Sequence, residues 1–344
     1  MSFEHKLTIR EAYVEASSFL LQHGASEAAS SAELLLQDLL GLTRSEMLLS
    51  WQEPFPQELE ARWRELLARR ASGEPVQYIL GEQEFYGLPF TVTPAVLIPR
   101  PETELLVEQI VLIGKQLWPE MAVGVEGSRV KSRADRDPAS LDEQPAQGEA
   151  AGEGLEAKHR ADTEGAAAGR PLIADIGAGS GAIAVSLAVQ CPQWRVVSSD
   201  ISPAALAVAQ ANAERHGVGE QVTFLEGDLL VPYIERGLQL DVVVSNPPYI
   251  PEADEVGLQP EVRLHEPRSA LYGGADGLEL YRRLTAQLAE LERLPALVGL
   301  EVGMGQADEV AKLLSQAGEW DEMRIIPDLA GIARHVIAIR YPER

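Results

Sequence analysis

The segment that most constrains the fold is residues 241–249, which read Asp-Val-Val-Val-Ser-Asn-Pro-Pro-Tyr. The valine run predicts a parallel strand, because strands covered on both faces are continuously apolar. The strand is followed by a tetrapeptide: Asn246, Pro247, Pro248 and Tyr249. Prolines fix φ and lack an N–H group, so this loop is rigid and rich in acceptors. Open α/β sheets bind ligands at the carboxyl ends of their strands, so we expect the tetrapeptide at a binding site.

The tetrapeptide has the chemistry to hold a planar amino group. The side-chain oxygen of Asn246 and a neighbouring main-chain oxygen can accept both hydrogens of an NH2 group, while Tyr249 covers its flat face. A proline-stiffened turn with no catalytic role is an equally common reason for such a sequence. On these residues alone, both interpretations stay open.

A second apolar run, residues 172–176, leads into a loop with three alternating glycines. The loop consists of Gly177, Ala178, Gly179, Ser180 and Gly181. Glycines let the backbone turn sharply and approach a ligand closely, and the helix that follows offers N–H groups. We expect Asp175 to hold an amino group of that ligand. The glycine spacing also fits the dinucleotide-binding pattern, so the loop alone leaves the cofactor open.

Two further acidic residues follow predicted strands. Asp200 ends the strand over 195–200, about 20 residues after the glycine loop, where a carboxylate accepts hydrogen bonds from ribose hydroxyls. With the glycine loop, it indicates a cofactor that contains a nucleoside. Asp228 follows a third strand and is placed to accept the amine of adenine, with Leu229 against the ring. A surface acid after a turn glycine explains Asp228 nearly as well.

The residues before the helix expected from position 101 offer one more candidate. Pro101 suits the first position of a helix, and Arg100 stands directly before it. We include Arg100 among the residues that contact substrate. Its alternative role is an ion pair with Glu102 or Glu104.

The order of elements predicts two domains and an insertion. Residues 1–82 contain two capping boxes and several amphipathic stripes, which predict a helical bundle. Such a bundle is either a scaffold or a substrate-recognition domain, and we predict the latter. Residues 83–96 predict a connecting β-hairpin. Residues 97–344 alternate strands and helices, which predicts a doubly wound, mostly parallel α/β sheet. Residues 119–170 lack periodicity and large apolar side chains, so we expect a disordered insertion.

Composition restricts the partners. The chain has 344 residues, and 53 acidic against 29 basic side chains give a net charge of −24. Proteins that grip duplex phosphates are normally basic, so the charge disfavours nucleic acid and favours a basic protein partner. The single cysteine permits no internal disulfide, and the histidines lack metal-ligand spacing. No apolar run is long enough to span a bilayer. We therefore expect a cytoplasmic protein with neither a metal nor a membrane partner.

Together these motifs resemble the class I S-adenosylmethionine-dependent methyltransferases that act on amino nitrogens. Three more segments, 77–81, 97–104 and 328–332, are similar to the peptide chain release factor glutamine methyltransferase family, PrmC/HemK. The resemblance covers nearly the whole chain outside the insertion. It implies a seven-stranded methyltransferase sheet behind an N-terminal helical domain. It also implies S-adenosylmethionine as cofactor and methylation of the glutamine N5 in the Gly-Gly-Gln motif of class I peptide chain release factors.

The resemblance also implies roles for the candidate residues. Catalysis is assigned to Asn246, Pro247 and Tyr249. Substrate binding is assigned to Asn246, Pro247, Pro248, Tyr249 and Arg100. Cofactor binding is assigned to Asp175, Gly177, Ala178, Gly179, Ser180, Gly181, Asp200, Asp228, Leu229 and Asn246. The alternatives are a nucleic-acid amino methyltransferase acting on adenine N6 or guanine N2, a nicotinamide oxidoreductase, and a non-catalytic ribosome-associated binding module.

Overall fold

The computed structural model describes residues 7–121 and 170–341. The predicted insertion at 119–170 therefore lies almost wholly outside the described residues. Its first three residues form a single 3-10 turn, η2 (Pro119–Met121). Within the described ranges, no helix is long and apolar enough to cross a membrane.

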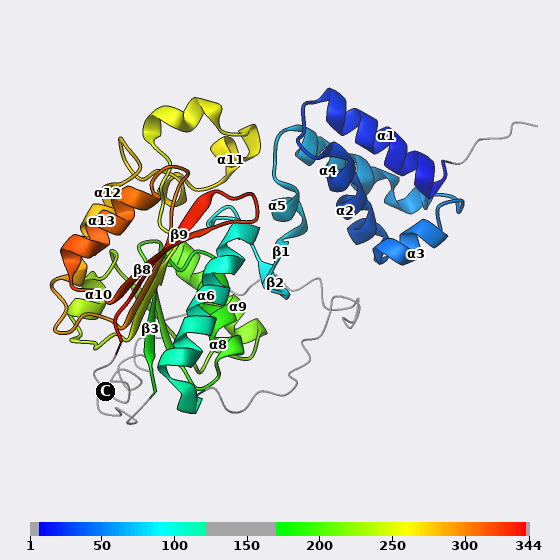
Figure 1. The fold of residues 1–344 in the computed structure, drawn as a ribbon. Coiled ribbons are helices and arrows are strands. Elements are labelled where there is room, and N and C mark those ends of the chain that lie inside the picture. The colour runs from blue at the N-terminus through cyan, green and yellow to red at the C-terminus, as the bar shows by residue number, and fades with distance from the viewer. Residues whose placement is uncertain (1–6, 122–169, 342–344) are drawn as a thin grey trace, which may run out of the picture.

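The N-terminal part is a bundle of short helices that lies beside the sheet domain (Figure 1). Both predicted capping boxes are formed; at the first, the Thr8 side chain accepts the N–H of Glu11, and the Glu11 carboxylate accepts the N–H of Thr8. The apolar stripes of the helices meet in one core that includes Leu20, Leu35 and Trp63. The elements are α1 (Ile9–Gln22), α2 (Ala28–Leu40), α3 (Arg44–Leu49), η1 (Gln57–Leu59), α4 (Glu60–Ala71) and α5 (Val76–Leu80).

A two-stranded antiparallel hairpin follows the bundle, with β1 (Glu82–Phe85) paired to β2 (Leu88–Thr91). The side chain of Asn212 fastens it to the sheet domain. The Asn212 oxygen accepts the N–H of Thr91 at 2.8 Å, and its nitrogen donates to the carbonyl oxygens of Thr91 and Ser180 at 2.9 and 2.8 Å. The hairpin is thereby held against the glycine loop. The domain limits themselves stay a prediction.

The predicted sheet is confirmed. Seven strands lie in the order β5-β4-β3-β6-β7-β9-β8. The first five run parallel, while β9 is antiparallel to both of its neighbours. The central strand β6 is the valine run, and all its residues are buried. The strands are β3 (Leu172–Ile176), β4 (Arg195–Asp200), β5 (Val222–Glu226), β6 (Val242–Ser245), β7 (Leu297–Glu301), β8 (Glu322–Pro327) and β9 (Ala333–Ile339).

Helices cover both faces of the sheet, because alternate strand residues face opposite sides. Ile173 belongs to one core and its neighbour Ala174 to the other. The first face carries α6 (Pro101–Leu117), α8 (Ala182–Gln190) and α9 (Pro203–Arg215). The second carries α10 (Val231–Ile234), α12 (Glu279–Leu288) and α13 (Ala307–Ala317). The long segment after the tetrapeptide contains η5 (Glu252–Gly257), α11 (Pro260–His265) and η6 (Arg268–Ala270).

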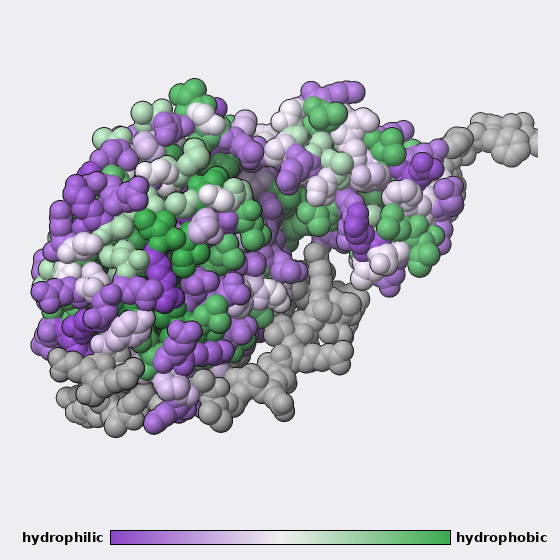
Figure 2. Space-filling view, viewed as in Figure 1, coloured by the Kyte–Doolittle hydropathy of each residue, from purple (hydrophilic) through white to green (hydrophobic). Residues whose placement is uncertain are grey.

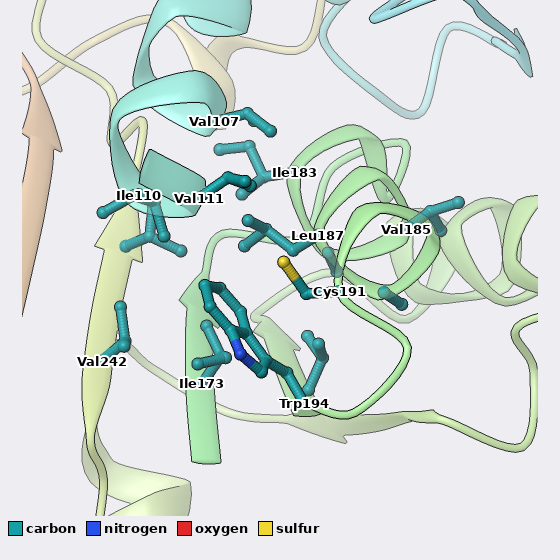
Figure 3. Close-up of a cluster of buried hydrophobic side chains, with 14 of the residues drawn as sticks. Val107, Ile110, Val111, Ile173, Ile183, Val185, Leu187, Cys191, Trp194 and Val242 are labelled. Atoms are coloured by element: carbon teal, nitrogen blue, oxygen red, sulfur yellow. The ribbon is translucent and has the colours of Figure 1, made fainter. Parts of the chain in front are cut away.

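Figure 3 shows the first core, where Ile110 and Val111 of α6 face Leu187, Cys191 and Trp194. The indole fits because α6 carries a glycine at position 114. A Cβ added there would lie 2.3 Å from the Trp194 ring. Close contact with the Trp194 ring thus fixes the position of α6 against the sheet.

Candidate active site

A cavity of about 310 Å³ lies at the carboxyl ends of the central strands. The loops after β3, β4, β5 and β6 all contribute to its lining, as the parallel arrangement predicts. It brings together most of the predicted site residues: Arg100, Gly177, Ala178, Gly179, Ser180, Asp200, Asp228, Leu229, Asn246, Pro247 and Pro248. Three candidates do not line it: Asp175, Gly181 and Tyr249.

The glycine loop is held in a conformation that favours glycine. Gly177, Gly179 and Gly181 have φ values of 85°, 53° and 80°. A Cβ at Gly177 or Gly179 would meet no atom within 4 Å, whereas one at Gly181 would lie 3.1 Å from Ala209. The first two glycines thus border open space on the cavity side, and the third permits α8 to approach α9.

Asp200 closes this loop from the neighbouring strand. Its Oδ2 accepts the N–H of Gly179 and its Oδ1 accepts the N–H of Ser202, each at 2.9 Å. A carboxylate oxygen can accept two hydrogen bonds, so each oxygen keeps capacity for one more donor. Asp200 therefore retains the acceptors that a ribose needs, already oriented by the backbone.

Asp175 lies behind the loop rather than on the cavity wall. It is fully buried, its Oδ2 accepts the hydroxyl of Ser198 at 2.8 Å, and its Oδ1 has no partner among the described residues. Burial raises the pKa of Asp175 to about 7, although the Ser198 hydrogen bond works in the opposite direction. Direct contact of Asp175 with a ligand stays a prediction.

Asp228 and Leu229 both face the cavity, but each shows a feature that the sequence did not indicate. Asp228 forms an ion pair with Arg283 of α12. Leu229 has a φ of 50°, a left-handed conformation that costs a non-glycine residue on the order of 1–3 kcal/mol. Backbone strain of this kind clusters at ligand sites, and Leu229 lines the cavity. The adenine contacts stay a prediction.

The tetrapeptide begins directly after β6. The Asn246 Nδ2 donates to the Thr103 hydroxyl at 3.0 Å, and Pro247 and Pro248 line the cavity. Tyr249 packs against the second core, and its carbonyl oxygen accepts the side-chain N–H of Gln306 at 2.9 Å. Burial raises the pKa of Tyr249 to about 12. Asn246 is thus presented to the cavity, while the stacking predicted for Tyr249 stays a prediction.

Arg100 lines the cavity and also forms an ion pair, but with an unexpected partner. Its Nη2 lies 2.5 Å from Oε1 of Glu266, so the pairing considered with Glu102 or Glu104 is wrong. Glu266 is 5% exposed, and burial raises the pKa of its carboxyl. The pair joins the start of α6 to the segment after the tetrapeptide.

Known proteins are similar in sequence over nearly the whole chain. Residues 11–81 match a model described as the PrmC N-terminal domain, and residues 166–260 match one described as the methyltransferase small domain. A release factor glutamine methyltransferase of Moorella thermoacetica is 39% identical over 337 residues, covering 98% of this chain and 100% of that protein. One of Geobacter sulfurreducens is 40% identical over 314 residues, covering 91% and 90%.

This chain belongs to the release factor glutamine methyltransferase family. It is an enzyme that transfers methyl groups, which confirms the resemblance and excludes the oxidoreductase and the binding module. Among solved structures, a human methyltransferase 10 domain containing protein is similar with a TM-score of 0.45 and 14% identity, over 75% of this chain and 90% of that one.

As a release factor glutamine methyltransferase, this chain also has site residues that the sequence reasoning missed. Thr103 accepts a hydrogen bond from Asn246 and donates one to Glu301. Arg283 and Glu266 form ion pairs with the predicted site residues Asp228 and Arg100. One signal was available. Glu301 ends a buried strand beside β6, and a carboxylate at a strand's carboxyl end is the pattern that identified Asp200.

Proposed function

We propose that this enzyme transfers the methyl group of S-adenosylmethionine to the side-chain amide nitrogen, N5, of the glutamine in the Gly-Gly-Gln motif of class I peptide chain release factors. The observation that carries this proposal is that one cavity is lined by residues 177–180 of the glycine loop, by Asp200, and by Asn246, Pro247 and Pro248 of the tetrapeptide. Family membership favours this protein substrate over a nucleic-acid base. The net charge of −24 favours it too, since phosphate-binding surfaces are basic.

The residues present fit the proposed cofactor. The open space beside Gly177 and Gly179 allows a ligand to approach the backbone, and Asp200 keeps one acceptor position on each oxygen for the ribose. Leu229 offers an apolar surface for the adenine. When bound, S-adenosylmethionine supplies a methyl group activated by a sulfonium, and the protein supplies binding and orientation.

The substrate side must compensate for a weak nucleophile, because an amide nitrogen shares its lone pair with the carbonyl. The Asn246 oxygen and the Pro247 carbonyl are proposed to accept hydrogen bonds from the two N–H groups of the glutamine side chain. These acceptors orient the nitrogen and stabilise the positive charge that develops on it. Orientation alone contributes up to ~7–11 kcal/mol for well-aligned reactants.

We propose that the helical bundle recognises the release factor. Figure 2 shows the surface hollowed between the bundle and the sheet domain. Arg70 of the bundle is bonded to Glu261, in the segment that follows the tetrapeptide, so a partner held by the bundle lies near the site. We expect the enzyme to act in the cytoplasm, where translation termination takes place.

The test uses labelled cofactor and purified release factor, followed by mass mapping. We expect one added methyl group on the glutamine of the Gly-Gly-Gln motif. A release factor in which this glutamine is replaced by glutamate is the control and should stay unlabelled. Label in DNA or RNA, with none in the release factor, would instead support the nucleic-acid alternative.

A further inference from the structure

We propose that Thr103 and Glu301 are positioning residues that fix the direction of the Asn246 side-chain amide, so that its oxygen meets the substrate NH2 group. This inference deepens the proposed function and rests on it for the identity of the NH2 group. The orientation of Asn246 itself is a property of the protein alone.

Three elements bring these residues together. Ser245 pairs with Leu300 in the sheet, so Asn246 and Glu301 each follow paired residues on adjacent strands. Thr103 lies in the first turn of α6, which packs against β7. The Asn246 Nδ2 donates to Thr103 Oγ1 at 3.0 Å, and Thr103 Oγ1 donates to Glu301 Oε2 at 2.6 Å.

Glu301 is the last residue of this hydrogen-bonded series, and its chemistry sets the direction of both hydrogen bonds. Burial raises the pKa of Glu301 to about 7, so its carboxyl is ionised above that pH. An ionised carboxylate only accepts hydrogen bonds, so in this state the Thr103 hydroxyl must donate its one proton to Glu301. The Thr103 oxygen is then left as an acceptor, and only the NH2 end of Asn246 can satisfy it. The Asn246 oxygen must therefore point the other way. A reversed amide would place two acceptor oxygens against each other.

Burial makes this preference strong. Thr103 is 4% exposed and Glu301 is 1% exposed, so water does not compete for these bonds. Hydrogen bonds in a low-dielectric environment polarise one another along a chain. When Glu301 is ionised, its charge increases the electron density on the Asn246 oxygen, which strengthens the hydrogen bond to an amide nitrogen that becomes positive during transfer.

The backbone roles of these residues do not require their side-chain chemistry. The N–H of Thr103 is already bonded to the Arg100 carbonyl at 3.1 Å, and the Glu301 carbonyl accepts the Tyr281 hydroxyl at 2.7 Å. A valine at position 103 keeps the volume and these backbone bonds, while removing the hydroxyl. This substitution isolates the positioning role.

The test compares Thr103→Val, Thr103→Ser and a matched control, Thr285→Val. Thr285 is 5% exposed, and among the described residues its hydroxyl donates to backbone carbonyls of its own helix. We expect Thr103→Val to lower kcat for release factor methylation by about tenfold or more, since it removes a hydrogen bond to a buried network. Binding of S-adenosylhomocysteine, measured by calorimetry, should stay at the wild-type value. Thr103→Ser should restore kcat, and Thr285→Val should not change it.

The direction of the amide is read separately and without substrate, from the side-chain NH2 resonances of Asn246 in 15N NMR spectra, assigned with Asn246→Asp. Thr103→Ser should keep the wild-type shifts, and Thr103→Val should move them. If Thr103→Val does not fold, Glu301→Gln takes its place. The glutamine NH2 can donate to Thr103 and so reverse the direction of the hydrogen bonds, and we again expect moved Asn246 shifts and a lower kcat. Unchanged shifts and kcat in the variant, or a serine variant as slow as the valine variant, would overturn the inference. A wild-type enzyme that fails to methylate release factors contradicts only the proposed substrate, because the NMR result stands independently.

Discussion

Arg70 of α4 lies 2.9 Å from Glu261 of α11, although 191 residues separate them in the sequence. Arg70 is 3% exposed and also donates to the carbonyl of Ser26 at 2.9 Å. The Ser26 hydroxyl donates to the same Glu261 oxygen. Burial works to raise the pKa of Glu261, but the hydrogen bonds from Ser26 and Arg70 outweigh it and lower the pKa. One carboxylate thus fastens the bundle to the segment beside the active site.

Arg70→Met should loosen this attachment, because it leaves the Glu261 carboxylate partly buried without its cation. The expected loss of stability is about 3 kcal/mol, as for other broken buried pairs. Hydrogen exchange across 260–265 should accelerate, as measured by mass spectrometry. Arg64→Met breaks an exposed pair with Glu60 and should have no such effect. Wild-type exchange rates in the Arg70 variant would show that the attachment lies elsewhere.

Asn246→Ala should abolish methyl transfer while cofactor binding largely persists. The alanine removes the acceptor for the glutamine NH2 group, and loss of one such group costs about 10²- to 10³-fold in rate. Single-turnover transfer to the release factor measures the rate, and calorimetry with S-adenosylhomocysteine measures binding. Unchanged turnover in this variant would refute the mechanism.

Asp200→Asn should weaken cofactor binding rather than slow the chemical step. It retains an oxygen for one of the two backbone N–H groups, but it loses the charge that strengthens bonds to the ribose. Each charge-assisted bond contributes about 1.5–3 kcal/mol, so Kd should rise by about tenfold or more. Asp276→Asn, the same change at an exposed ion pair with Arg282, should leave Kd unchanged. Equal Kd values for both variants would remove Asp200 from the cofactor site.

Asp175 should make the stability of the sheet domain depend on pH. Burial raises its folded-state pKa from 3.8 to about 7, so between these values the native state holds a proton that the unfolded chain releases. The stability contribution of Asp175 is therefore greatest below about pH 4 and falls as pH rises to about 7. Asp175→Asn removes this titration.

Urea unfolding followed by tryptophan fluorescence should show the effect. From pH 5 to pH 7, the free energy of unfolding of the variant should rise relative to that of wild type by on the order of 1–3 kcal/mol. Each pKa unit corresponds to about 1.4 kcal/mol. Asp254→Asn changes an exposed acid and should follow the wild-type pH profile. A constant difference between the Asp175 variant and wild type at all pH values would contradict the assigned titration.

Local sequence patterns predicted the fold, and most of the candidate site residues lie on the cavity wall, for one physical reason. Parallel strands end at the same edge, so residues found separately at strand ends, such as Gly177, Asp200 and Asn246, had to meet. The pairs that sequence reasoning missed join residues far apart in the chain. Thr103 and Asn246 are 143 residues apart, and Arg100 and Glu266 are 166 apart. No local periodicity reports such a contact, because it depends on how whole elements pack.

Asp175 marks another limit of the sequence. It belongs to the same motif as the glycine loop, yet its side chain is enclosed beside Ser198 and not on the cavity wall. A strand-end carboxylate can turn toward a ligand or into the protein, and the motif is the same in both cases.

Gly177 and Gly179 have room for a methyl group, since no atom lies within 4 Å of either added Cβ. Alanine at these positions would be strained by the positive φ, at a cost of roughly 1–2 kcal/mol per residue, and not by a lack of volume. The glycine loop therefore favours the one residue that has no Cβ and adopts a positive φ without strain. A library that varies only side-chain size at these two positions should find no replacement, however small, that the backbone accepts without strain.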